Sequence, residues 1–118
     1  MSGGPEEPLV RGPPARLELG ERFELALRAN PTTGYSWVLT VPPELALIEE
    51  SHERDSDLVG AGGVKTFRFE GARCGPARLV ALYRRPWEPG APRRLAWTIE
   101  VVVAGRADLG SVALGAAP

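Results

Sequence analysis

Cysteine-dependent catalysis needs a thiol beside a base, and this chain contains one cysteine and one histidine. Cys74 lies in the turn-like string Ala-Arg-Cys-Gly-Pro, whereas His52 lies earlier, in a charged segment. Because no local spacing pairs the two side chains, we interpret them as a turn cysteine and a solvated histidine. The sequence therefore indicates no cysteine-dependent catalytic centre.

Carboxylates and glycines likewise form no recognisable metal or phosphate site. The acidic residues of segment 49–57 lack the ligand spacing and central glycine of a calcium loop. The glycine string at 60–63 precedes a strand pattern, whereas a phosphate-binding loop would open a helix. Two distant carboxylates brought together by the fold stay an open alternative without a positive signal. We expect no metal, no cofactor and no enzymatic activity.

The overall composition is that of one globular domain. The 118 residues are 43% hydrophobic and 25% charged, with a formal net charge of -1. That charge favours no polyanion, so we expect no nucleic-acid partner, and no apolar run is long enough for a membrane span. A single cysteine excludes an intrachain disulfide, and the first residues resemble no signal peptide. We expect a monomer, with a cytoplasmic location as the default.

The first of three unusual loops is the Thr-Thr loop, Asn30-Pro31-Thr32-Thr33-Gly34-Tyr35. Proline fixes φ, asparagine can bond its own backbone, and glycine accepts a positive φ. The two β-branched threonines present short hydroxyl groups with few rotamers. An ordinary hairpin needs only Asn-Gly, so this loop predicts a stiff polar tip that loses little entropy on docking.

The other two are the Gly-Gly loop, Gly60-Ala61-Gly62-Gly63, and the Trp loop, Arg84-Arg85-Pro86-Trp87-Glu88-Pro89-Gly90. A glycine string permits close approach of main chain to a partner, although flexible linkers have the same composition. A tryptophan between prolines cannot belong to a central strand, and beside arginine it has the composition of a binding hot spot. The alternative is a tryptophan that folds back to cap the core.

Alternating short segments must position these loops. Period-two patterns with Gly and Pro between them predict strands at 15–20, 22–29, 35–41, 45–50, 64–71, 77–84 and 94–104. No helical periodicity separates them, which predicts an all-β, immunoglobulin-like antiparallel β-sandwich of seven to eight strands without a disulfide. We expect residues 1–14 to be a disordered tail, 15–104 the domain, and 105–118 a tail, with an edge strand in it as the alternative.

In an immunoglobulin-like sandwich, successive connections alternate between the two ends. The three loops would then emerge at one end and form a single surface. The strings at 30–35, 60–63 and 85–88, in this order and spacing, closely resemble the three motifs of the chagasin family of cysteine peptidase inhibitors. The resemblance covers roughly residues 15–104, and the conjunction of three motifs is more specific than any one.

The resemblance implies a wedge of three loops that enters the active-site cleft of papain-like cysteine peptidases and blocks it reversibly and non-covalently. It implies that Thr32 and Thr33 meet the catalytic centre, that residues 60–63 follow the cleft, and that Arg85 and Trp87 grip the far side, with Pro86 between them. The alternatives are an immunoglobulin-like interaction or scaffold domain that binds another partner, and a small enzyme, for which no pocket signal exists.

Overall fold

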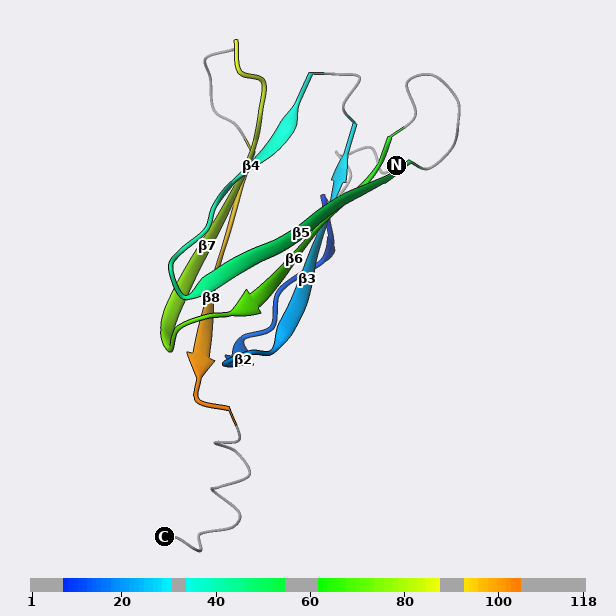
Figure 1. Ribbon diagram of the computed structural model, residues 1–118. Helices are drawn as coiled ribbons and strands as arrows, with labels where there is room; N and C mark the ends of the chain where they lie inside the picture. Colours follow the sequence, from blue (N-terminus) through cyan, green and yellow to red (C-terminus); the bar gives the residue numbers. More distant parts are fainter. Residues whose placement is uncertain (1–7, 31–33, 55–61, 88–92, 105–118) are drawn as a thin grey trace, which may run out of the picture.

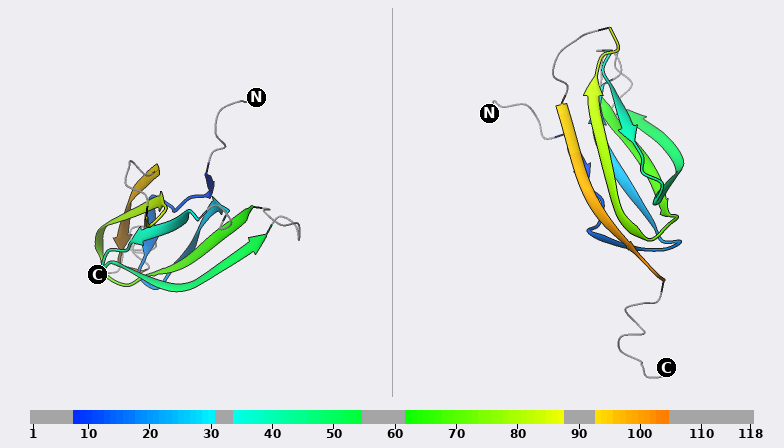
Figure 2. Two further views of the ribbon diagram at one scale, coloured as in Figure 1. Left: turned by 90° about the horizontal axis from the view of Figure 1, so that it is seen from above. Right: turned by 90° about the vertical axis from the view of Figure 1, so that its left-hand side faces the viewer.

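The computed structural model describes residues 8–30, 34–54, 62–87 and 93–104, and within them the backbone forms eight β-strands and no helix. The strands are β1 (Leu9–Arg11), β2 (Arg16–Glu18), β3 (Arg22–Ala29), β4 (Ser36–Thr40), β5 (Leu45–Arg54), β6 (Gly63–Gly71), β7 (Gly75–Arg84) and β8 (Arg93–Val102). They make two four-stranded sheets, ordered β1-β3-β6-β5 and β2-β8-β7-β4 (Figures 1 and 2). The predicted all-β sandwich without a disulfide is confirmed.

The first expected strand differs from the prediction in two respects. It is shorter, since β2 covers only Arg16–Glu18, and its pair with β8 is parallel where we expected only antiparallel pairs; β1, which precedes it in the chain, pairs with β3 in the other sheet. The chain changes sheet at Gly12-Pro13-Pro14, where two residues lack the N–H groups that a continuous ladder needs.

Part of the expected N-terminal tail also belongs to the sandwich. Residues 9–11 form β1, and the buried Pro8 accepts a hydrogen bond of 2.8 Å from the backbone N–H of Arg28. Composition alone favoured an extended, unpaired segment here, but an extended segment is also what a sheet edge can bind. The pairing with β3 decides between the two.

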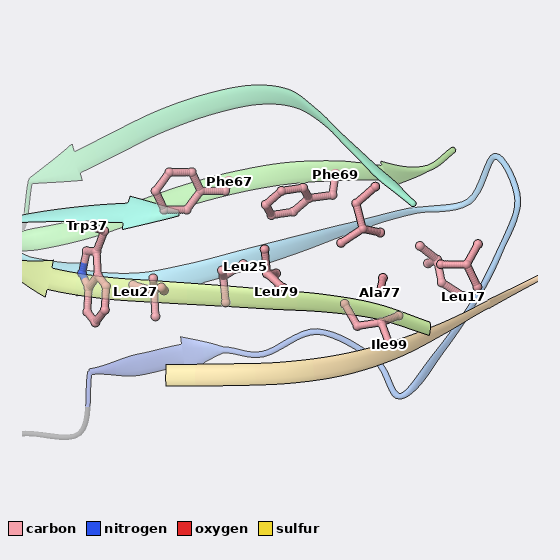
Figure 3. Close-up of a cluster of buried hydrophobic side chains, with 12 residues drawn as sticks. Leu17, Leu25, Leu27, Trp37, Phe67, Phe69, Ala77, Leu79 and Ile99 are labelled. Atoms are coloured by element: carbon pink, nitrogen blue, oxygen red, sulfur yellow. The ribbon is translucent and has the colours of Figure 1, made fainter. Parts of the chain in front are cut away.

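The core lies between the sheets and follows the predicted period of two. Its members come from both sheets and are the inward residues Leu17, Leu25, Leu27, Trp37, Leu45, Phe67, Phe69, Ala77, Leu79, Ala81, Ile99 and Val101 (Figure 3). Outward residues on the same strands stay accessible, as Val38 does with 48% exposure. Burial of each large side chain contributes about 1.5–3 kcal/mol, so this layer holds the sheets together.

The strand expected at 45–50 is longer than predicted. β5 continues to Arg54, which pairs with Gly63 of β6, after an irregularity between Leu47 and Glu49. Its second half is mostly charged and faces solvent, so it carries no apolar alternation that a sequence pattern can detect. Backbone pairing with β6 is what makes it a strand.

A ladder of charges crosses the outer face of the β1-β3-β6-β5 sheet. Arg11 and Arg68 both bond Glu24, at 2.6 and 2.9 Å, and Arg68 also bonds Glu49 at 2.9 Å. The Arg68 hydrogen bond is the main cause that holds the pKa of Glu24 below its ordinary value of 4.5. All four strands of this sheet thus contribute one member to a connected set of ion pairs.

We expect Glu24→Gln to reduce the acid sensitivity of the fold. A carboxyl whose pKa is depressed in the folded state stabilises it above its unfolded pKa, and this stabilisation disappears as the pH falls through the folded pKa. The free energy of unfolding, measured in urea from pH 6 down to pH 2, should therefore fall less steeply for the variant. Parallel curves for the two proteins would contradict the assignment.

Candidate functional site

The three loops approach one another at a single end of the sandwich. A Cβ atom added to Gly34 would lie 2.5 Å from Cη2 of Trp87, so the Trp loop packs directly on the Thr-Thr loop. A Cβ atom on Gly62 would lie 3.9 Å from the Cβ of Asn30, which places the Gly-Gly loop at the other flank. The adjoining strand ends lie in the upper part of Figure 1, those of β4 and β7 toward the left and those of β5 and β6 toward the right.

The described residues include most of the predicted contact set. Those found at this end are Asn30, Gly34, Tyr35, Gly62, Gly63, Arg85, Pro86 and Trp87. Five others, Pro31, Thr32, Thr33, Gly60 and Ala61, lie outside the described residues. The structure therefore describes the base of each loop, and the base of the Thr-Thr loop lies next to those of both other loops.

Stacked aromatic rings lie beneath the loops. The ring of Tyr83, near the end of β7, stacks on that of Trp37 in β4 with centroids 4.6 Å apart, and on that of Tyr35 at 5.1 Å. The guanidinium carbon of Arg85 lies 4.4 Å from the centroid of the Tyr35 ring, a cation–π contact. We call these four residues the aromatic column. It joins the Thr-Thr loop and the Trp loop to the core.

Two hydrogen bonds tie this column to the opposite sheet. The backbone N–H of Asn30 donates to Oη of Tyr83 at 3.2 Å, and the indole N–H of Trp37 donates to the carbonyl of Arg28 at 2.9 Å. Arg28 belongs to β3 in one sheet, whereas Trp37 and Tyr83 belong to β4 and β7 in the other. The point where the chain leaves β3 for the Thr-Thr loop is therefore fixed from across the sandwich.

Tyr83 is a site residue that the sequence reasoning missed. The alternation of β7 identified it as a half-buried strand residue and gave its hydroxyl group no role. A tyrosine in place of phenylalanine at the rim of a core is itself a signal, because a phenol largely removed from water needs a hydrogen-bond partner. The identity of that partner, Asn30, depends on a contact between residues 53 positions apart.

Backbone conformation and close packing explain why two positions at this end, 34 and 63, are glycine. Gly34 has a φ of 85°, in the left-handed region that glycine adopts without strain, and any side chain there would clash with Trp87. Gly63 opens β6 between Ala29 and Arg54, and a Cβ atom there would collide with the carbonyl oxygen of Glu53. Close packing of the protein's own backbone accounts for a glycine at position 63.

Trp87 lies on the surface and not in the core. Its side chain is 69% exposed, with one part of the ring against Gly34, and Pro86 beside it is also exposed. The alternative in which this tryptophan caps the core is therefore wrong. A large aromatic surface held on a short loop is available for contact.

The flank of the column away from β7 is open. A hollow of about 320 Å³ lies between the edges of β4 and β5, lined by Ala29, Tyr35, Ser36, Trp37, Glu50, His52 and Lys65. No backbone ladder joins these two edge strands. The contacts of Tyr35 with Tyr83 and Arg85 lie on the side away from this hollow.

Cys74 and His52 lie far apart in the described part of the chain. His52 pairs with Lys65 in the loop-side half of β6, whereas the exposed Cys74 follows Gly71 at its far end. About 20 Å of strand separates the two positions. Within the described ranges, no group of three or more His, Cys, Asp or Glu residues is placed to hold a metal ion. No helix in those ranges is long and apolar enough to cross a membrane.

Comparison with known proteins identifies relatives of this chain. A family model described as chagasin family peptidase inhibitor I42 matches residues 16–106. Amoebiasin-1 of Entamoeba histolytica is 37% identical over 86 residues, which cover 71% of this chain and 83% of that protein. Chagasin of Trypanosoma cruzi is 33% identical over 78 residues, covering 60% and 71% of the two chains.

Solved structures show the same architecture. The cysteine protease inhibitor EhICP2 from Entamoeba histolytica superposes with a TM-score of 0.61 at 25% identity, over 75% of this chain and 83% of that one. The solution structure of amebosin gives a TM-score of 0.56 at 33% identity, over 75% and 85%.

We expect Tyr83→Phe to loosen the start of the Thr-Thr loop while the sandwich stays folded. The variant keeps the stacked ring but removes the acceptor of the Asn30 N–H, a hydrogen bond that contributes about 0.5–1.5 kcal/mol. Hydrogen exchange at the Asn30 amide should accelerate about two- to tenfold. The amides of Leu25 and Phe69, in the same sheet, serve as the internal control; an unchanged rate at Asn30 would contradict the role given to the hydroxyl group.

Proposed function

The chain belongs to the chagasin family of peptidase inhibitors, a family of inhibitors and not of enzymes, and from this premise we propose that it inhibits papain-like cysteine peptidases reversibly and non-covalently. One solved relative supports the target class, because EhICP2 is described as a cysteine protease inhibitor.

The observation that carries this proposal is the convergence of three loops that are distant in sequence. At one end of the sandwich Gly34 packs against Trp87 and Gly62 lies beside Asn30, next to an aromatic column that is anchored in the core. A surface organised before binding loses little conformational entropy when it docks. This arrangement suits a wedge that enters a cleft without refolding.

We assign the parts of the wedge as the family resemblance implies. Thr32 and Thr33 would face the catalytic cysteine and histidine of the peptidase, and residues 60–63 would extend along the cleft with main-chain hydrogen bonds. Arg85 and Trp87 would grip the surface beside it. The exposed indole of Trp87 and the contact of Arg85 with Tyr35 support the third assignment.

A non-covalent block agrees with the chemistry of this end of the molecule. The only thiol, Cys74, lies at the opposite end of β6, so it cannot form a disulfide with the peptidase thiol while the loops occupy the cleft. The interaction would then depend on shape, hydrogen bonds and burial of apolar surface.

Titration of papain or cathepsin L with the purified protein tests the proposal. We expect competitive loss of peptidase activity that recovers on dilution, with the inhibitor intact on a gel, and the Cys74→Ser variant should inhibit equally well. Full activity at micromolar inhibitor is what a scaffold domain for another partner predicts, and it would disprove the proposal.

We expect Trp87→Ala to weaken inhibition by about 1–4 kcal/mol, the range of an aromatic hot spot. The side chain is 69% exposed, so its removal should change the free energy of unfolding by less than about 1 kcal/mol. Inhibition constants and urea unfolding measured side by side distinguish the two effects. Unchanged inhibition combined with lost stability would mean that the ring only supports the loop.

A further inference from the structure

Arginines on the outer faces of the two sheets differ in whether they form ion pairs with carboxylates. On the β1-β3-β6-β5 sheet, the arginines Arg11, Arg22 and Arg68 all bond carboxylates. On the outer face of the β2-β8-β7-β4 sheet, Arg84 and Arg94 are exposed, and no ion pair joins them to a carboxylate of the described residues. Carboxylates therefore balance the charges of these three arginines on the first sheet. On the second sheet, no carboxylate of the described residues balances Arg84 or Arg94.

These two arginines are neighbours on that face. Arg84 lies opposite Ser36 of β4, while Arg94 of β8 lies opposite Leu82. Leu82 and Arg84 are two positions apart on β7, so their side chains point to the same face. Arg84 and Arg94 are therefore diagonal cross-strand neighbours, and the Cα atoms of such a pair lie about 7–8 Å apart. No intervening acidic side chain separates them in the ladder.

Apolar surface surrounds the arginines and continues to the wedge. Val38 is 48% exposed beside Leu82, and with Ser36, Arg84 and Pro86 it lines a shallow hollow of about 250 Å³. Pro86 leads directly to Trp87. We call Val38, Leu82, Arg84, Pro86 and Arg94 the arginine face. It extends the proposed inhibitory surface down one side of the sandwich.

We propose that the arginine face is a second contact surface, which binds carboxylate groups on the rim of the peptidase cleft beside the groove that the loops enter. This inference rests on the proposed function and concerns which peptidases the inhibitor captures fastest. Arginine presents a planar donor group that matches a carboxylate in a bidentate pair, and its charge attracts an acidic surface before contact.

The charge pattern favours an acidic partner over a second copy of this chain. A two-fold contact through the arginine face would bring Arg84 and Arg94 of both copies together, and like charges at close range oppose association. A partner with acidic groups at its rim meets no such repulsion. It would also cover the exposed Val38 and Pro86.

Association kinetics of Arg84→Glu/Arg94→Glu test the inference. At low ionic strength, we expect its association rate constant with an acidic papain-like peptidase to fall about tenfold, and its dissociation rate constant to rise by at least about twofold because the pairs with the rim carboxylates are lost. In about 1 M salt, where the Debye length is about 3 Å, the difference should nearly vanish. Arg84→Ala/Arg94→Ala removes the two positive charges without adding negative ones, so its association rate constant should fall less, by about threefold.

The matched control is Arg16→Glu/Arg73→Glu, which changes the net charge equally at the opposite end of the sandwich, at the start of β2 and in the turn after β6. Equal slowing in both double variants, or slowing independent of the charge of the peptidase, would overturn the inference and leave the proposed function intact. A wild-type dimer that dissociates in the arginine variant would overturn it as well. Failure of wild-type inhibition would remove both proposals.

Discussion

The Tyr83 side chain joins the two sheets where the loops meet, and the geometry of that end depends on it. Its ring contacts Trp37 below and Tyr35 beside it, while its hydroxyl group holds the backbone N–H of Asn30 from the other sheet. Removal of the ring would take away the surface on which Tyr35 rests and, through Tyr35, the partner of Arg85. The packing of Tyr83 at the edge of the core therefore helps to determine where the bases of the Thr-Thr loop and the Trp loop lie.

The immunoglobulin-like connection pattern brings the bases of the three loops to the end of the sandwich where Tyr83 lies. Alternate connections return to the same end, so the described ends of the loops lie near one another there, with Gly34 against Trp87 and Gly62 beside Asn30, although strands separate them in sequence. Each loop begins and ends in a hydrogen-bonded strand, and the sheets are rigid because their inner faces interlock around Phe67 and Phe69. The packed sheets therefore supply the stability of the domain.

The charged residues on the two outer faces of the sandwich differ in their ion pairs. Glu24, Arg68 and their partners satisfy one another across one sheet, where exposed ion pairs add modest stability and screen each other's charge. Arg84 and Arg94 lack such partners in the described residues, so their field extends into solvent on the side of the molecule that continues from Trp87. A near-neutral net charge therefore conceals an uneven surface.

Local patterns determined much of this protein. Alternation predicted the strands, their inward residues and the all-β class, because period and turn chemistry act between near neighbours in the chain. The resemblance of three loop sequences to the chagasin motifs indicated the family and the candidate surface. Only the tertiary structure decided that Tyr83 holds Asn30, that residues 9–11 of the expected tail add β1 to the sheet opposite β2, that β5 continues to Arg54, and which arginines bond carboxylates. Each of these depends on contacts through space between distant segments, and no period in the sequence records them.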